Sequence, residues 1–464
     1  MIQKIASVKE LDYAYSESKN QLAVLYGSDG CQKEQYVREF LKGKEYFYYR
    51  AAALPEEEQK KRFAAQIASR YPLDEEEADY EIYFENMYSS DGSKLVFVID
   101  EFEYLAKKNS DFLEEILNLK QRNSARNEIM ILLCSSSPAF VEQKMKSVLG
   151  KSSSLIDVVY KIEPLQFLDI VRMFPENTVS ECVGIFGIFG SVRNYLKHWN
   201  AKESIKENVC KMIHFETAPQ ECVIRGCPWG ILSADNKLFF TAERYLGKYH
   251  TILTAIAAGC KKLKELRRYT GYSGVKIRRY LKKLIESDIV EKIVSFEITG
   301  RGKAQKVIYR IKNTWLHFWY RFVYPNLSDF YIYTPEEFYD RYIESELREY
   351  LESCFVKVCM EYLKLMNRAG RLPFEIRDIG TWIGKGGIID IAAQNDEHET
   401  IVGICRWSKE QMEYTEYEKL EELMKEAKIS AKYCFLFSGG TFAPALVEKA
   451  GEDKRVILVD MTEL

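Results

Sequence analysis

The sequence predicts an α/β protein built on a parallel sheet, and two stretches near the N-terminus carry that prediction. Residues 94–102, KLVFVIDEF, form an apolar run that ends in Asp100 and Glu101, which is the pattern of a buried strand. Residues 22–26 form a second apolar run, followed by a glycine-containing turn and an amphipathic segment. Because parallel strands bring their carboxyl ends to one edge of a sheet, we expect the two acids and the turn to meet there.

The composition favours a reduced, cytoplasmic protein of several domains. A chain of 464 residues is too long for one ordinary core, so two to four domains are expected. Its 11 cysteines are scattered singly, without the paired spacing of a zinc site. No apolar run approaches the roughly 18 residues of a membrane span, so we expect no membrane partner. The net charge of −3 argues against a uniformly basic surface but leaves room for a local basic patch.

The turn after the first strand resembles a degenerate phosphate-binding loop. A P-loop has the pattern GxxxxGK[ST], and here Gly27, Gly30 and Lys33 are present while Gln32 and Glu34 replace the second glycine and the hydroxyl residue. A Cβ at the glycine position obstructs close approach of the backbone to phosphate, and the missing hydroxyl normally binds magnesium. Two interpretations stay open: a weakened or lost ATP site, and an ordinary strand-to-helix turn with a surface lysine.

The acids and a later serine fit the rest of a nucleotide site. An acid at the end of a parallel strand can hold Mg²⁺, and a second acid can orient the attacking water; we assign these roles to Asp100 and Glu101. A third apolar strand, residues 129–135, leads into Ser136, which suits a sensor of the γ-phosphate. A simple turn cap is equally compatible with a serine at this point.

A basic segment in the middle of the chain predicts a winged helix-turn-helix. Residues 249–286 contain three short amphipathic segments, and 290–311 have the pattern of a β-hairpin. Residues 261–283 hold ten lysines and arginines and one acid. The candidate DNA-binding residues are Lys276, Arg278, Arg279, Lys282 and Lys283 on the recognition helix, with Arg301 and Lys303 on the wing. Duplex DNA is the expected partner, through its phosphates; a protein-interaction module is the alternative.

Several longer motifs point to one family. YGSDGCQKEQYV, FVIDEFEYLAKKNSDF, LLCSSSPAFVE, YRIKNTWLHFWYRFVYPN and GGIIDIAA with GICRW together resemble the archaeal-type P-loop ATPase family, with an AAA- or STAND-like core and a C-terminal nuclease-like domain of unknown function. The resemblance implies that Gly27 and Lys33 belong to the P-loop, Asp100 and Glu101 to the second nucleotide motif, and Ser136 to the sensor position. It implies ATP and Mg²⁺ as cofactors, weakly bound or lost because of the two P-loop departures.

The C-terminal part resembles a restriction-endonuclease-like core without its full active pattern. That pattern needs an aspartate, then an acid and a lysine on the next strand, which hold Mg²⁺ and orient water. Asp390 fits the aspartate position and is a candidate metal ligand, but Ile404 and Arg406 replace the acid and the lysine, and the helix position that is often glutamate is Val356. We therefore expect no nuclease activity; a metal-dependent nuclease that uses Asp390 and Glu375 is the weaker alternative.

The expected architecture has four parts: a P-loop ATPase-like domain over 1–160, a helical lid over 161–245, the winged helix over 246–312, and a linker with the nuclease-like domain over 313–464. The linker's aromatic stretch, residues 315–326, is expected to form a core cluster, although aromatic side chains also stack on bases. The favoured function is a DNA-binding or regulatory protein with a degenerate ATP site and an inactive nuclease-like domain. An ATP-binding or ATP-hydrolysing switch is the alternative.

Overall fold

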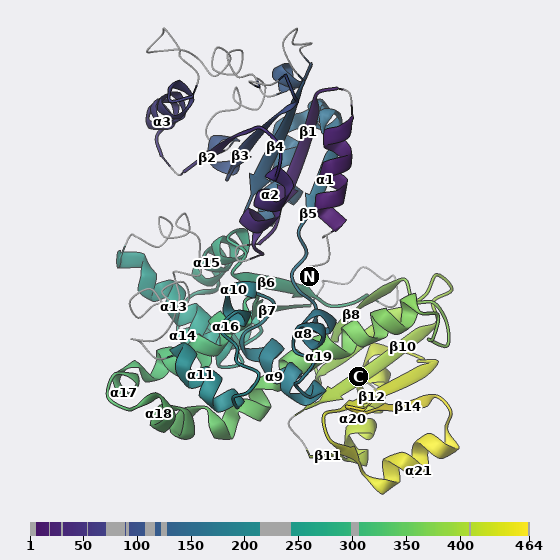
Figure 1. Ribbon diagram of the computed structural model, residues 1–464. Helices are drawn as coiled ribbons and strands as arrows, with labels where there is room; N and C mark the ends of the chain where they lie inside the picture. Colours follow the sequence, from purple (N-terminus) through teal and green to yellow (C-terminus); the bar gives the residue numbers. More distant parts are fainter. Residues whose placement is uncertain are drawn as a thin grey trace. The chain divides into compact units, whose positions relative to one another are not determined.

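The computed structural model describes the chain except for residues 1–5, 18, 29–30, 53, 71–88, 90–91, 107–116, 122–127, 214–242, 298–305, 408–409 and 463–464. Contacts divide it into two compact units, the first built mainly from Met1–Pro164 and the second mainly from Leu165 onward (Figure 1). Each unit is considered by itself. Within the described residues, no helix is long and apolar enough to cross a membrane.

The first unit is a five-stranded parallel sheet with the strand order β2-β3-β4-β1-β5. Its strands are β1 (Gln21–Tyr26), β2 (Tyr46–Arg50), β3 (Leu95–Asp100), β4 (Ile129–Ser135) and β5 (Val158–Lys161). Strand β4 pairs with β1 on one side and β3 on the other. Strand β4 therefore separates β1, which leads into the turn before Lys33, from the acid-bearing strand β3, and the predicted parallel sheet is confirmed.

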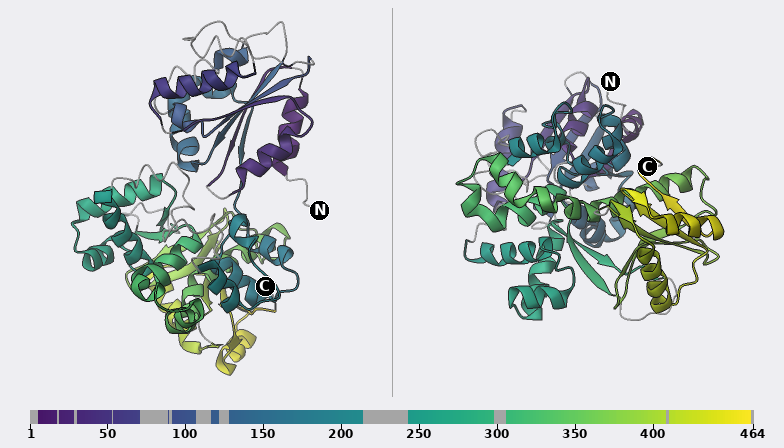
Figure 2. Two further views of the ribbon diagram at one scale, coloured as in Figure 1. Left: turned by 60° about the vertical axis from the view of Figure 1, so that its left-hand side comes forward. Right: turned by 90° about the horizontal axis from the view of Figure 1, so that it is seen from below.

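Helices cover both faces of this sheet (Figures 1 and 2). Helices α1 (Ala6–Ser16) and α2 (Lys33–Leu41) pack on one face. Helix α3 (Glu56–Ala68) and the π-helix Phe140–Met145 pack on the other. Every residue of β1, β3 and β4 is buried, which explains why these strands are continuous apolar runs rather than alternating ones.

Within the second unit, the helical segment after the first unit packs closely on later elements. It contains α8 (Phe167–Met173), α9 (Val179–Ile188), α10 (Arg193–Leu196) and α11 (Ile205–Ile213). A Cβ added at Gly187 of α9 would collide with Leu351, and one at Gly190 with Thr314. Gly190 also has a φ of +70°, which favours glycine. These glycines let the chain approach the following helices closely.

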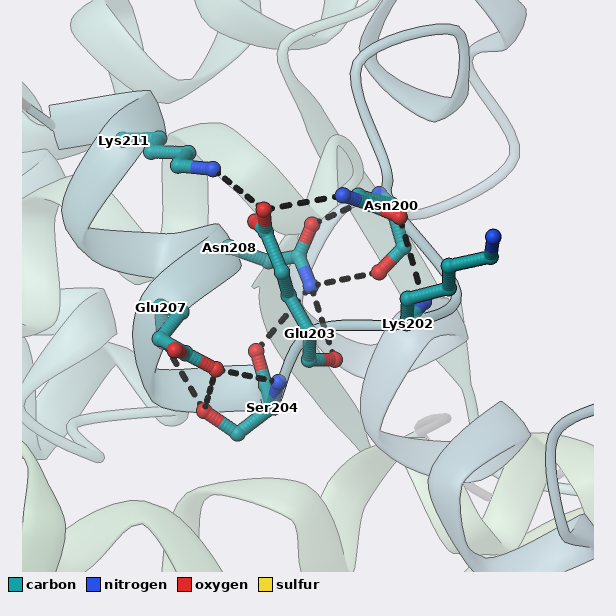
Figure 3. Close-up of polar contacts among 7 residues, drawn as sticks. All are labelled: Asn200, Lys202, Glu203, Ser204, Glu207, Asn208 and Lys211. Atoms are coloured by element: carbon teal, nitrogen blue, oxygen red, sulfur yellow. Dashed lines mark hydrogen bonds and ion pairs between the residues drawn. The ribbon is translucent and has the colours of Figure 1, made fainter.

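A buried amide fixes the start of α11 (Figure 3). The Asn208 side chain donates to the carbonyls of Asn200, Glu203 and Ser204 at 3.0, 3.2 and 3.0 Å and accepts from the Asn200 amide at 2.8 Å. Ser204 and Glu207 add a reciprocal pair of side-chain to backbone bonds, the capping box of a helix N-terminus. Because the polar atoms of this buried amide are satisfied, the loop before α11 has one defined conformation.

The middle of the second unit has three helices followed by a hairpin, as the sequence predicts. They are α13 (Glu243–Ala257), α14 (Leu263–Thr270), α15 (Gly274–Glu286), β6 (Val290–Val294) and β7 (Val307–Ile311). The two strands pair antiparallel. Just after β6, the Phe296 amide donates to the Thr381 carbonyl at 2.8 Å, so the end of this hairpin that leads into its loop is attached to the C-terminal sheet.

The aromatic stretch 315–326 forms a core cluster, as expected. It spans α16 (Thr314–Phe318), the π-helix Trp319–Val323 and the 3-10 turn Tyr324–Asn326, and its buried aromatics are Trp315, Phe318, Trp319, Tyr320 and Phe322. Trp315 stacks on the Phe189 ring at 5.6 Å between centroids. Because these rings are buried, they are not available to stack on nucleic-acid bases.

The C-terminal sheet has the order β14-β12-β10-β9-β8, in which β8, β9 and β10 are antiparallel neighbours and β10, β12 and β14 are parallel. The strands are β8 (Asp378–Ile383), β9 (Ile388–Gln394), β10 (Thr400–Arg406), β12 (Tyr433–Ser438) and β14 (Val456–Val459). Short strands β11 (Gln411–Met412) and β13 (Thr441–Phe442) form a separate pair. Helix α19 (Glu344–Arg368) precedes the sheet, and α20 (Tyr414–Ala427) and α21 (Pro444–Glu452) pack on it.

The first of these strands begins partway through a segment with a strand-like pattern. Residues 374–380, FEIRDIG, start with alternating apolar and polar side chains, the pattern of a strand, but β8 covers Asp378–Ile383. The Asn367 side chain at the end of α19 accepts from the Ile376 amide and donates to its carbonyl, both at 2.9 Å. This pair of bonds holds residue 376 against the helix, so sheet pairing starts only beyond it.

Candidate functional site

The carboxyl ends of the first unit's strands carry a buried polar cluster. Asp100 ends β3 opposite Arg50 of β2 and Cys134 of β4 in the strand register. Lys33 is the first residue of α2, which follows β1 and its turn. The sheet therefore brings the predicted lysine and acids together, as the order of the strands requires.

Lys33 lies between both predicted acids. Its Nζ is 2.5 Å from Asp100 Oδ1 and 2.8 Å from Glu101 Oε1. All three side chains are only 2% exposed. A buried ion pair is stable only when its geometry and hydrogen bonds compensate for lost hydration, and here one ammonium group serves two carboxylates. The lysine expected to meet phosphate is thus engaged inside the protein.

Three further side chains complete the cluster. The Ser136 hydroxyl donates to Glu101 Oε1 at 2.6 Å, so the predicted sensor serine contacts the predicted base. The Tyr48 hydroxyl donates to Asp100 Oδ2 at 2.7 Å. The half-exposed Arg50 guanidinium lies 3.7 Å from each carboxylate. Asp100 and Glu101 therefore receive hydrogen bonds or ion pairs from side chains of β2 and α2 and from Ser136, just after β4.

The pKa shifts agree with this pairing. Burial by itself would lower the pKa of Lys33, but the charges of Glu101 and Asp100 outweigh burial and hold that pKa above its usual value. Burial would raise the pKa of Glu101, and Lys33 and Ser136 reverse that shift and lower it. Both groups are consequently charged at neutral pH.

A third acid behind this cluster behaves differently. Glu103 is buried, and its Oε2 has no hydrogen-bond partner among the described residues. Burial, followed by the negative charge of Glu101, raises the pKa of Glu103 to about 7. Glu103 therefore carries a proton through much of the acidic range, where Glu101 does not.

The residue that replaces the second P-loop glycine has a backbone conformation that favours glycine. Gln32 has a φ of +61°, a left-handed conformation that costs a non-glycine residue about 1–2 kcal/mol. At Gly27 a Cβ would lie 2.6 Å from the Cys31 Sγ, so this position requires glycine. Glu34 is exposed in the first turn of α2. Gly30 lies outside the described residues.

The C-terminal sheet holds a second carboxylate centre, around Asp390. The Arg406 guanidinium contacts Asp390 Oδ2 at 3.1 Å and Glu416 Oε2 at 2.7 Å, and lies 3.9 Å from Glu352 Oε1. The Cys405 amide also donates to Asp390, at 3.1 Å. Burial raises the pKa of Asp390 although Arg406 opposes that shift. An arginine thus lies where a nuclease of this type would bind its cation.

The other candidate ligand does not join this centre. Glu375 is exposed in the segment before β8, and the Asp390 carboxylate contacts Cys405 and Arg406 instead. Among the described residues, no group of three or more histidine, cysteine and acidic side chains has a geometry suited to a metal ion. The three acids that meet here instead, Glu352, Asp390 and Glu416, share one arginine.

The predicted DNA-binding residues lie mainly on the exposed side of α15. Arg278, Arg279, Lys282 and Lys283 are exposed, while Lys276 is half-buried with its ammonium 3.6 Å from the centroid of the Tyr272 ring. In the described part of the chain, Arg278, Arg279 and Lys282 form no ion pair. Arg301 and Lys303 fall outside the described residues.

Sequence analysis missed Tyr48, Arg50, Glu352 and Glu416. Tyr48 and Arg50 lie in an aromatic strand whose sequence gives no sign that it runs beside β3. Glu352 is on α19 one turn before Val356, the position that was expected to carry the acid. The spacing of carboxylates along α19 is a signal that a search one turn to either side would have found.

Comparisons with known proteins agree with this architecture. Residues 319–420 match the family DUF234, described as archaea bacterial proteins of unknown function. An uncharacterized protein of Methanocaldococcus jannaschii is 26% identical over 396 residues, which cover 84% of this chain and 83% of that protein. The match over residues 319–420 agrees with the C-terminal domain of unknown function that the sequence resemblance implies.

Two solved structures of archaeal proteins align with this chain. The Walker-type ATPase PABY2304 of Pyrococcus abyssi aligns with a TM-score of 0.42 and 13% identity over 69% of this chain and 96% of that one. The ORC2 protein of Aeropyrum pernix, solved with ADPNP and ADP, aligns with a TM-score of 0.42 and 14% identity over 72% and 95%.

Replacing Lys33 should destabilise the first unit strongly. Lys33→Ala leaves two buried carboxylates without their cation, and breaking such a pair costs about 3–5 kcal/mol. Urea denaturation measures the change. Lys42→Ala, at the exposed end of the same helix, is the control and should change the free energy of unfolding by less than about 0.5 kcal/mol. Equal effects of the two substitutions would contradict the buried pairing.

Glu103 should give the stability a pH dependence that glutamine removes. Its folded pKa of about 7 lies above the ordinary 4.5, so the folded state binds this proton more tightly than the unfolded state. That contribution is complete below pH 4.5 and is lost as pH rises to 7, a difference of about 3 kcal/mol. Relative to wild type, Glu103→Gln should therefore gain stability between pH 4.5 and pH 8. A pH-independent difference in unfolding free energy would refute this assignment.

Proposed function

We propose that this chain, which resembles archaeal-type P-loop ATPases and matches DUF234 over residues 319–420, is a DNA-binding regulatory protein rather than a nuclease. The observation that carries the proposal is a contrast in charge. Each carboxylate centre is paired with an internal cation, Lys33 in the first unit and Arg406 in the second. On α15, in contrast, Arg278, Arg279 and Lys282 are exposed and form no ion pair with the described residues.

DNA is the partner that best suits this surface. Duplex DNA carries a dense row of phosphates that lysine and arginine neutralise with release of counterions. Three helices and a hairpin present the third helix to the major groove in winged helix-turn-helix proteins. The loop end of the hairpin is attached to β8 through Phe296, which supports a contact made mainly by α14 and α15 among the described elements.

The proposed inactivity of the nuclease-like centre follows from Arg406. A divalent cation at Asp390 would have to displace a guanidinium that is held by several carboxylates at once. Arginine also cannot act as a general base, because it does not deprotonate in proteins. The centre therefore supports the C-terminal domain as a structural ion network.

An ATP-responsive switch is the second candidate, and the Gln32 backbone favours it. Gln32, directly before α2, has the left-handed conformation that favours glycine, and a helix N-terminus such as that of α2 can face an anion. Nucleotide binding would require Lys33 to leave Asp100 and Glu101. The two candidates therefore differ in whether ATP can compete for this lysine.

DNA binding should depend on the α15 charges in a salt-sensitive way. Arg278→Gln, Arg279→Gln and Lys282→Gln together should reduce the slope of log affinity against log salt by about 2.7 if each residue contacts one phosphate. Fluorescence anisotropy with a random-sequence duplex measures the slope. Lys419→Gln, Lys425→Gln and Lys454→Gln remove the same charge from other exposed positions of the C-terminal domain and should leave the slope unchanged. Equal slopes for wild type and the α15 variant would remove the basis of the proposal.

Calorimetry with ATP and Mg²⁺ separates the two candidates. We expect no heat of binding for the wild type at millimolar ATP, and measurable binding for Gln32→Gly combined with Glu34→Thr, which restores the P-loop pattern. Adding Lys33→Ala to that double variant should abolish the gain. Binding of ATP by the wild type below millimolar concentration would favour the switch instead.

A further inference from the structure

Val275 is an exposed apolar residue at the second position of α15. Its side chain is 76% exposed, whereas Ile277, Leu281 and Leu284 of the same helix are buried. Single exposed apolar residues are common on protein surfaces, so exposure by itself assigns no role to Val275. Its neighbours on the helix decide whether it belongs to a binding surface.

Helical geometry places Val275 in line with two basic residues. At 3.6 residues per turn, positions 275, 279 and 282 follow the i, i+4, i+7 pattern and share one face, opposite the buried residues. Arg279 and Lys282 are the exposed residues at the second and third of these positions. The valine is therefore the apolar first member of an otherwise basic outward stripe.

Other basic groups flank this stripe at the start of the helix. A Cβ at Gly274 would lie 3.6 Å from Arg267 Cδ and 4.0 Å from Arg278 Nη1, so two guanidinium-bearing side chains from successive helices lie close together there. On α15 itself, the Lys276 ammonium is held over the Tyr272 ring. Positive charge thus surrounds Val275, which fits a polyanion and disfavours an apolar protein partner.

The position of Val275 corresponds to base contact when such a helix enters DNA. The N-terminal residues of a recognition helix meet base edges in the major groove. The only apolar group presented there is the 5-methyl group of thymine, which small apolar side chains contact. We propose that Val275 packs against a thymine methyl group and so gives α15 sequence preference, an inference that rests on the proposed DNA-binding function.

The test compares thymine with uracil in the same site. The full chain is first used to select duplexes from a random library, and anisotropy then measures the affinity for a selected duplex and for versions with single thymines replaced by uracil. One replacement should weaken wild-type binding about fourfold, the worth of one buried methyl group. Val275→Ala removes the two γ-methyl groups, so it should distinguish the two duplexes less than the wild type does, and it should keep its affinity for random-sequence DNA, since that affinity is electrostatic.

Val447→Ala is the matched control, because Val447 is a 54% exposed valine of α21 in the same unit. It should retain the wild-type preference for thymine. Discrimination between thymine and uracil by Val275→Ala as strong as by the wild type would overturn the inference, and so would a selection that enriches no sequence. If the wild-type chain bound no DNA at all, that result would instead overturn the proposed function itself.

Discussion

The pairing of Lys33 with Asp100 and Glu101 is the interaction on which the first unit depends. A parallel sheet with both faces covered delivers the ends of β1, β3 and β4 to one edge, where any charged group loses hydration. Two adjacent carboxylates cannot remain buried there without a cation. In an active ATPase, a magnesium ion bound with the nucleotide phosphates helps to balance the charge of such carboxylates. Here the Lys33 ammonium group, at the start of α2, pairs with both carboxylates directly.

The same solution appears in the C-terminal sheet, on an unrelated set of residues. Arg406 brings a permanent positive charge to Asp390, Glu416 and Glu352, and these acids come from a strand and two helices. Because arginine stays charged at any physiological pH, Arg406 is a permanent cation among these acids. In both units the acids are thus held in internal ion networks, while Arg278, Arg279 and Lys282 place positive charge on the exposed side of α15.

Much of the fold could be predicted from the sequence, since buried parallel strands such as β3 are continuous apolar runs and the helices of the basic segment are strongly amphipathic. The spacing of Lys33 from its strand also located the turn correctly. The internal pairing of Lys33 with Asp100 and Glu101 could not be predicted, because spacing along the chain does not tell which cation pairs with Asp100. The spacing of carboxylates along α19 makes Glu352 a candidate, but which turn of this helix meets Arg406 depends on how the helix packs on the sheet.

The most direct test of this account is the chemical reactivity of Lys33 in the native protein. Acylation of lysines followed by mass spectrometry should find Lys33 unreactive, with and without millimolar ATP and Mg²⁺, while the exposed Lys42 reacts under both conditions. Burial and the raised pKa of the Lys33 ammonium predict this protection, because only a neutral amine is nucleophilic. A Lys33 that reacts readily in the free protein and is protected by ATP would contradict the account.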